Sequence, residues 1–168
     1  MPMVEMHLSA VRVEIPSNQP PLLLQETSGN RRTLPIYIGP AEAQAIAFAQ
    51  QGVETPRPMT HDLLRDVIEE LGARVECIVI TELRDRTFFA EIRLIVGGQR
   101  HTVSARPSDA VALAVRVDGS IYAEEDLLDA EGVILPAEDD EEEDEAAADE
   151  LVSEFREFIE GIRPEDFG

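Results

Sequence analysis

An internal repeat constrains the fold of this chain more than any other feature of its sequence. Residues 106–114 (RPSDAVALA) repeat, with conservative changes, residues 39–47 (GPAEAQAIA), which lie 67 positions earlier. In both copies a proline is followed two residues later by a carboxylate, Glu42 or Asp109, within an alanine-rich segment. Proline is favoured at the first position of a helix, where its missing N–H needs no partner. The repeat therefore predicts two equivalent helices that each begin beside an acidic side chain.

Segments typical of β-strands precede both predicted helices. They are rich in β-branched and other strand-forming residues, end at turn-forming residues, and lie at 4–15, 22–27, 33–38, 75–82, 88–96 and 99–105. Between the two sets, apolar residues recur at helical spacing and predict a helix at 59–72, with Leu63, Leu64, Val67, Ile68 and Leu71 on one side. The chain thus contains two sets of three strands and a helix, joined by a further helix.

The offset of 67 continues through the predicted strands without a gap. It aligns Leu22 with Phe89 and Ile36 with Val103. We therefore predict an α+β fold with a mixed or antiparallel sheet built from two β-β-β-α repeats and a connecting helix, followed by an acidic linker and a C-terminal helix. Because the six strands of such a sheet leave edges that must be covered, we also expect a homo-oligomer.

The negative charge of the chain is concentrated near its C-terminus. The net charge is −21, of which residues 138–168 supply −13 and residues 1–137 only −8. Residues 138–145 are all Asp or Glu and cannot pack against a core. Beyond them, Leu151, Phe155, Phe158, Ile159 and Ile162 recur at helical spacing. We predict a domain at 1–135, an acidic disordered linker at 136–148 and an amphipathic helix at 149–168 that requires a partner, either the domain, another subunit or a different protein.

Cysteine usage and hydropathy predict a soluble cytoplasmic protein. The chain has one cysteine, Cys77, within a predicted strand, so no intrachain disulfide can form and we expect this side chain to be buried. No apolar stretch approaches the roughly 18 residues that suggest a membrane-spanning helix. We therefore expect no association with membranes.

Residues near the predicted helix starts could carry metal-assisted hydrolysis of phosphodiester bonds. That chemistry needs carboxylates to hold a cation such as Mg²⁺ or Mn²⁺, a base, and positive groups that bind the phosphate. The candidate metal ligands are Glu42, Asp62 and Asp109, and the candidate catalytic residues are His61, Asp62 and Asp109. The candidate substrate-binding residues are Arg57, Arg106 and Ser108, and in the repeat Arg106 and Ser108 replace Gly39 and Ala41, so only the second copy has groups able to hold a phosphate.

Each candidate also has an interpretation without function. A carboxylate in the first turn of a helix gains about 0.3–1 kcal/mol from the helix dipole alone. His61 and Asp62 are neighbours on a helix and do not face each other. Glu42 and Asp109 as a pair are more informative, because two carboxylates about 4 Å apart repel by roughly 4 kcal/mol at an effective dielectric constant near 20. If they converge, a cation or a shared proton is required.

Three ordered blocks resemble the signature motifs of the bifunctional nuclease family. They are PIYIG at 35–39 with Glu42, RPMTHDL at 57–63, and RPSDAVALA at 106–114, and the likeness covers roughly residues 4–135. The resemblance implies an α+β domain and a nuclease that cuts both DNA and RNA with little sequence specificity. The family usually has an aspartate two residues before the last block, where this chain has Ser104. A hydroxyl is a weaker ligand for Mg²⁺ than a carboxylate, so this difference bears on activity.

The sequence supports two classes of function. One is a metal-dependent nuclease that acts on DNA and RNA, although an acidic domain without a basic stripe should bind a polyanion weakly. The other is a non-enzymatic interaction or regulatory domain that binds a small anion or a protein partner, with the C-terminal helix as its docking element. Convergence of Glu42, His61, Asp62, Arg106 and Asp109 in one cleft would favour a site, and dispersal over separate helix ends would leave only helix capping.

Overall fold

Two β-β-β-α units form the body of the fold. The computed structural model describes residues 2–11, 21–135, 152–153 and 157. The first unit consists of β1 (Met3–Val11), β2 (Pro21–Glu26), β3 (Thr33–Tyr37) and α1 (Pro40–Gln50), and the second of β4 (Ala73–Arg84), β5 (Thr87–Val96), β6 (Gln99–Ala105) and α3 (Pro107–Val117). Helix α2 (Thr60–Glu70) joins the units, and β7 (Ser120–Glu124) and α4 (Glu125–Glu131) follow them. The predicted α+β class is confirmed, and α1 and α3 begin and end 67 residues apart.

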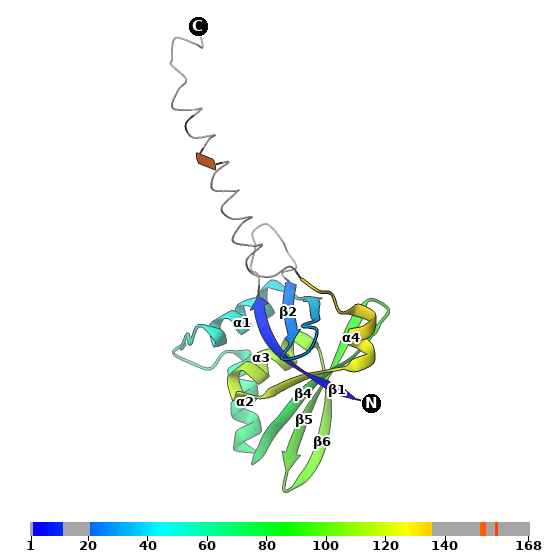
Figure 1. Cartoon of the computed structure of the whole chain (residues 1–168). Coiled ribbons are helices and arrows are strands. Elements are labelled where there is room, and N and C mark those ends of the chain that lie inside the picture. The colour runs from blue at the N-terminus through cyan, green and yellow to red at the C-terminus, as the bar shows by residue number, and fades with distance from the viewer. Residues whose placement is uncertain (1, 12–20, 136–151, 154–156, 158–168) are drawn as a thin grey trace. The chain divides into compact units, whose positions relative to one another are not determined.

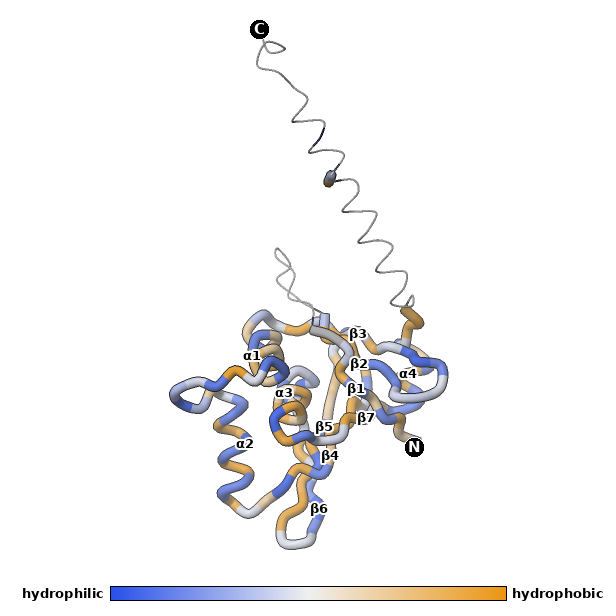
Figure 2. Tube along the Cα trace, turned by 60° about the vertical axis from the view of Figure 1, so that its left-hand side comes forward, coloured by the Kyte–Doolittle hydropathy of each residue, from blue (hydrophilic) through white to orange (hydrophobic). Residues whose placement is uncertain are grey.

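A strand outside the repeat connects the two units into one mixed sheet. The strand order is β3-β2-β1-β7-β4-β5-β6. Strand β7 is antiparallel to β1 and parallel to β4, so a sheet of seven strands replaces the six expected from the repeat. Helices α1, α2 and α3 lie together on one side of the sheet, and α4 lies away from them (Figure 1, Figure 2). Both repeat helices therefore present their first turns on the same side of the sheet.

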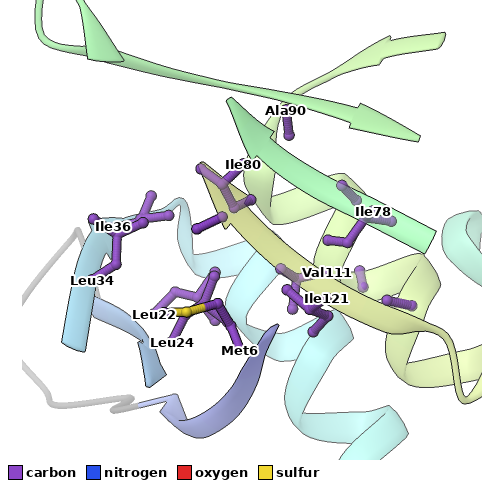
Figure 3. Packing of buried hydrophobic residues seen from close by; sticks show 14 of the residues in the cluster. Met6, Leu22, Leu24, Leu34, Ile36, Ile78, Ile80, Ala90, Val111 and Ile121 are labelled. Carbon is purple, nitrogen blue, oxygen red and sulfur yellow. The ribbon is translucent and has the colours of Figure 1, made fainter. Parts of the chain in front are cut away.

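The hydrophobic core lies between the sheet and the repeat helices. Helix α3 is its centre, because Ala110, Val111, Ala112, Leu113 and Ala114 are each at most 1% exposed. Small alanines allow α3 to pack closely against its neighbours. Figure 3 shows strand residues of both units converging on this layer, including Met6, Leu22, Ile36, Ile78 and Ile80. Cys77 is also buried, as predicted.

The strand registers support the repeat but correct its alignment. A β-bulge follows Leu8 in β1 and follows Val75 in β4, at positions 67 apart. Next to these bulges, however, Val11 pairs with Leu22 whereas Ile78 pairs with Ile92. Leu22 therefore corresponds to Ile92 and not to Phe89. Compared with the first unit, the second unit has a longer first hairpin and a shorter second hairpin. The two differences in length cancel, so the ungapped alignment was wrong at the strand between them.

Helix α2 forms where its periodicity predicted it, but its apolar side is open. None of its residues is buried: Leu63 and Val67 are 54% and 46% exposed, and Leu71, which directly follows the helix, is 75% exposed. Only Ile68 packs against the core as a partly buried residue. Periodicity alone shows that a helix has an apolar side, and the packing of other elements decides whether that side is covered.

The chain divides into two units, residues 1–134 and 135–168, and of the second unit the structure describes only residues 135, 152–153 and 157. Most of the predicted linker at 136–148 and helix at 149–168 lies outside the described residues, so both stay predictions. Within the described ranges, no helix combines the length and the apolar character needed to span a membrane.

Candidate active site at the start of α3

The first turns of α1 and α3 meet through one arginine. Arg106, the residue before α3, has φ −72° and ψ 144°, and Gly39, the residue before α1, has φ −72° and ψ 157°. Both are extended because each precedes a proline. Arg106 Nε donates to Asp109 Oδ2 at 2.8 Å, and its Nη2 donates to Asp109 Oδ1 and Glu42 Oε1, both at 3.1 Å. The two equivalent carboxylates of the repeat thus converge on a single guanidinium.

This guanidinium supplies the positive charge that the two carboxylates require. Hydrogen bonding to Asp109, and then its charge, raises the pKa of Arg106 above its ordinary value. Burial raises the pKa of Asp109, but hydrogen bonds from Arg106 and His61 outweigh burial and leave this pKa below its ordinary value. Asp109 is therefore an ionised, acceptor-only group at neutral pH.

His61 reaches the same carboxylate from the first turn of α2. Its Nε2 lies 2.9 Å from Asp109 Oδ1, and its side chain is only 11% exposed. Because an ionised carboxylate can only accept, Nε2 must carry the hydrogen, which leaves Nδ1 as the proton-accepting atom of a neutral imidazole. His61, Asp109 and Arg106 thus form a continuous hydrogen-bonded chain.

Asp62 turns to a different partner, as expected for the helical neighbour of His61. Its Oδ1 accepts from Arg116 Nε at 2.7 Å, and its Oδ2 accepts from the backbone N–H of Met59 at 3.0 Å. The hydrogen bond from Arg116 is the main cause that lowers the pKa of Asp62. Asp62 is thereby held in a helix-capping ion pair.

Arg116 is a residue that the sequence analysis missed. Its side chain is 4% exposed, and besides Asp62 it binds the backbone carbonyls of Ala112 at 2.8 Å and Ala45 at 2.9 Å. It therefore ties α3 to both α1 and α2. Its position seven residues after Asp109 could have indicated that it lies near the site, because residues seven apart lie on the same side of a helix.

A cavity of about 270 Å³ opens at this convergence, and we call it the helix-start cavity. Its lining includes Glu42, Phe48, His61, Arg106, Asp109 and Arg116. Asp62 lines a neighbouring cavity of about 540 Å³, which shares Phe48 and Arg116 with the first. Of the five residues whose convergence would favour a site, the structure thus brings Glu42, His61, Arg106 and Asp109 together. The fifth, Asp62, faces the neighbouring cavity.

The other two predicted substrate-binding residues lie outside the helix-start cavity. Arg57 does not contribute to its lining, and its backbone carbonyl accepts a hydrogen bond from the Thr55 hydroxyl at 2.6 Å. Ser108 is 6% exposed and lines a further cavity, beside Tyr37 and Arg106. Arg106 lines both the helix-start cavity and the cavity that contains Ser108. Of the three predicted phosphate ligands, it is the one that lines the helix-start cavity.

Gly39 provides room for the carboxylate of Glu42. A Cβ atom at position 39 would clash with Glu42 Oε2. The backbone at this glycine is ordinary extended backbone, so the requirement is for space and not for an unusual φ. The first copy of the repeat thus keeps a glycine where the second has Arg106, and Glu42 occupies the space that a side chain would fill.

The three predicted metal ligands do not gather as one set in the described structure. Glu42 and Asp109 share Arg106, and Asp62 faces Arg116. Across the described ranges, no group of three or more His, Cys, Asp or Glu side chains is arranged to hold a metal ion. This donor set does not fit a cation held jointly by Glu42, Asp62 and Asp109.

Ser104 lies on the other face of the sheet. It pairs with Glu91, whereas the flanking pairs, Val103 with Ile92 and Ala105 with Ala90, place Ala90 and Ile92 in the core. Because side chains alternate along a strand, Ser104 and Glu91 point away from the helices. The departure at this position therefore does not remove a group from the helix-start cavity.

Known proteins resemble this chain over nearly its whole length or over the domain. The bifunctional nuclease domain matches residues 22–136. An uncharacterized protein of Mycobacterium tuberculosis is 47% identical over 165 residues, which are 98% of either chain. Bifunctional nuclease 2 of Oryza sativa subsp. japonica is 28% identical over 119 residues, which are 68% of this chain and 36% of the rice protein. Bifunctional nuclease 2 of Arabidopsis thaliana is 28% identical over 115 residues, 67% of this chain and 35% of that protein. The chain belongs to the bifunctional nuclease domain family.

Proposed function

We propose that this protein is a nuclease that hydrolyses phosphodiester bonds of DNA and RNA in the helix-start cavity. The observation that carries the proposal is the chain of hydrogen bonds from His61 through Asp109 to Arg106, which lines one cavity at the start of α3. The family match supports it, as do the names of the plant relatives. Little sequence specificity is expected, because Arg106 is the exposed guanidinium of the cavity, and contacts to the phosphate backbone carry no sequence information directly.

Each residue of the cavity has a distinct role in this proposal. Arg106, whose side chain is 65% exposed, binds the scissile phosphate next to the N-terminus of α3, where backbone N–H groups also favour an anion. His61 is the catalytic base, and Asp109 orients it and stabilises its protonated form. Glu42 positions Arg106. The predicted role of Asp62 changes from catalysis to holding the start of α2 through Arg116.

Electrostatics set the expected strength of substrate binding. The chain carries a net charge of −21, so nucleic acid is repelled at long range and attracted only at the local arginine. Few phosphate contacts imply weak binding with a shallow dependence on salt concentration. A requirement for Mg²⁺ or Mn²⁺ stays a prediction, and any such ion would have to displace Arg106 from Glu42 and Asp109.

The test is hydrolysis by the full chain and by the Asp109→Asn variant. Supercoiled plasmid and single-stranded RNA are incubated with Mg²⁺, with Mn²⁺ or with EDTA, and nicking and strand shortening are followed over time. His101→Gln is the matched control, because His101 is exposed on β6 and does not line the helix-start cavity. We expect activity in the wild type and the control and its loss in Asp109→Asn. Equal residual activity in all three preparations would identify a contaminant and refute the assignment.

The open side of α2 supports a second candidate, an interaction or regulatory domain. Leu63, Val67 and Leu71 expose about half or more of their surface on one helix, which is a common mark of a protein-binding surface. A homo-oligomer or a separate protein partner would cover it. A Val67→Glu/Leu71→Glu variant should then have a lower molar mass by light scattering or lose its partner, while its circular dichroism shows that it stays folded.

A further inference from the structure

We propose that the helix-start cavity cleaves RNA by attack of the substrate's own 2′-hydroxyl, with His61 as general base and without a metal ion. This inference rests on the proposed nuclease function and specifies its substrate class. It predicts that cleavage of RNA survives removal of divalent cations, and that cleavage of DNA, which lacks the 2′-hydroxyl, occurs only when Mg²⁺ or Mn²⁺ is present.

The donor atoms of the cavity are the first basis for the inference. A divalent cation that activates water needs several oxygen ligands free to coordinate it. Asp109 uses both carboxylate oxygens for Arg106 and His61, and Glu42 Oε1 is bound to Arg106. The same guanidinium therefore occupies the position between the carboxylates that a cation would take. The groups that remain available for chemistry are an imidazole and a guanidinium.

The imidazole has one nitrogen available for a proton. Nε2 of His61 donates to Asp109, so Nδ1 is the acceptor. In the described part of the chain, no side chain or backbone group forms a hydrogen bond with this Nδ1. Asp109 fixes the ring and would stabilise the imidazolium that forms when Nδ1 takes a proton, which is the arrangement of an oriented general base.

The guanidinium can bind a phosphate without releasing its carboxylates. Arg106 uses Nε and Nη2 for Asp109 and Glu42, and among the described residues Nη1 makes no hydrogen bond. The side chain is 65% exposed. Two N–H groups of Nη1 can thus face a phosphate oxygen, and the charge develops on that oxygen in the transition state.

A substrate that carries its own nucleophile fits such a site better than one that needs activated water. A neighbouring hydroxyl has an effective concentration of roughly 10⁵–10⁸ M in favourable cases. RNA has this hydroxyl beside the phosphorus, and DNA lacks it. In the step we propose, the 2′-oxygen forms a bond to phosphorus while its proton passes to Nδ1 of His61. The bond from phosphorus to the 5′-oxygen breaks, and that oxygen receives the proton from the imidazolium or from water. The products are a 2′,3′-cyclic phosphate and a 5′-hydroxyl, so atoms and charge balance without a co-reactant.

The experiment uses two labelled oligonucleotides with the full chain in EDTA. One is all DNA, and the other has the same sequence with a single ribonucleotide at its centre. Product ends are identified by mass spectrometry. The variants are His61→Gln and Asp109→Asn, with His101→Gln as the matched control, and the fold of each is checked by circular dichroism and thermal unfolding.

We expect cleavage only at the ribonucleotide, with a 2′,3′-cyclic phosphate end, and a rate at least about 100-fold lower in His61→Gln, since a general base contributes about 10²–10⁴-fold. Cleavage of both oligonucleotides only with Mg²⁺ or Mn²⁺, leaving 5′-phosphate or 3′-hydroxyl ends, would overturn this inference and leave the proposed nuclease function standing. A cyclic product formed at equal rates by wild type and a folded His61→Gln variant would identify a contaminating ribonuclease and overturn it as well. Absence of any cleavage under all conditions would refute both proposals.

Discussion

Replacing Gly39 with alanine should disturb the active site while leaving the fold almost unchanged. The added Cβ would clash with Glu42 Oε2, so the carboxylate must move away from the start of α1. Its hydrogen bond to Arg106 Nη2, at 3.1 Å, is then lost, while the two bonds from Arg106 to Asp109 remain. The perturbation thus removes one of three contacts that position the guanidinium.

The magnitudes indicate a small effect on stability and a measurable effect on rate. Alanine accepts φ −72° and ψ 157° without strain, and replacing glycine restricts the unfolded chain, which stabilises by about 0.4–1 kcal/mol. Alanine is less favourable than glycine at the residue just before a helix, which lowers the unfolding free energy by about 0.5–1 kcal/mol. The partly exposed Arg106–Glu42 pair contributes about 0.2–1 kcal/mol. The net change in unfolding free energy should stay within about 1 kcal/mol, and loss of that pair's energy from the transition state would lower kcat/KM by roughly 1.4- to fivefold.

A double-mutant cycle provides the decisive assay. Thermal unfolding and cleavage of the ribonucleotide-containing substrate are measured for the wild type, Gly39→Ala, Glu42→Ala and the double variant. If alanine at position 39 acts through Glu42, it has no further effect on the rate once Glu42 is alanine. An equal loss of rate on adding Gly39→Ala in the Glu42→Ala background would refute this reasoning, and so would a Gly39→Ala chain that keeps the full rate.

Three further predictions concern residues outside the cavity. Glu26, 4% exposed, accepts hydrogen bonds from Arg32 at 2.7 and 3.0 Å, so Glu26→Gln should lower the unfolding free energy at pH 7 by roughly 3 kcal/mol in urea titrations. The hydrogen bond from Arg32 lowers the pKa of Glu26 in the folded protein. The stabilisation by ionised Glu26 is therefore present above its ordinary pKa near 4.5 and is lost as pH falls through the lower pKa of the folded state. The wild type and Glu26→Gln should thus converge in stability in acid. Leu113→Ala in the core should lower the unfolding free energy by about 2–5 kcal/mol, whereas Leu71→Ser, at a side chain 75% exposed, should change it by at most about 0.5 kcal/mol. Equal losses of unfolding free energy in the two variants would contradict the packing described. Ser104→Asp should change the cleavage rate less than twofold, because this side chain points away from the helices, and a gain of tenfold or more would show that the face of the sheet was assigned wrongly.

The local elements were predictable because their signals are local. Pro40 and Pro107 mark helix starts through a constraint that each carries in its own ring. The segments 88–96 and 99–105 were predicted as strands for the same reason, and Gly97 and Gly98 between them both have positive φ in the turn that pairs β5 with β6. The repeat then implied equivalent positions for Glu42 and Asp109, and with His61 and Arg106 these are the residues of the cavity that the sequence predicted.

The sequence by itself determined two helices that each begin with a carboxylate, a histidine at the start of a third helix, and one arginine at the junction. Only the tertiary structure decided that Arg106 would bridge both carboxylates, that His61 would join Asp109 while Asp62 turned to Arg116, and that Ser104 would face away from them. It also decided that β7 would unite the two halves and that α2 would remain open on its apolar side. These outcomes depend on which elements pack together, and packing is a property of the whole chain that no single segment encodes.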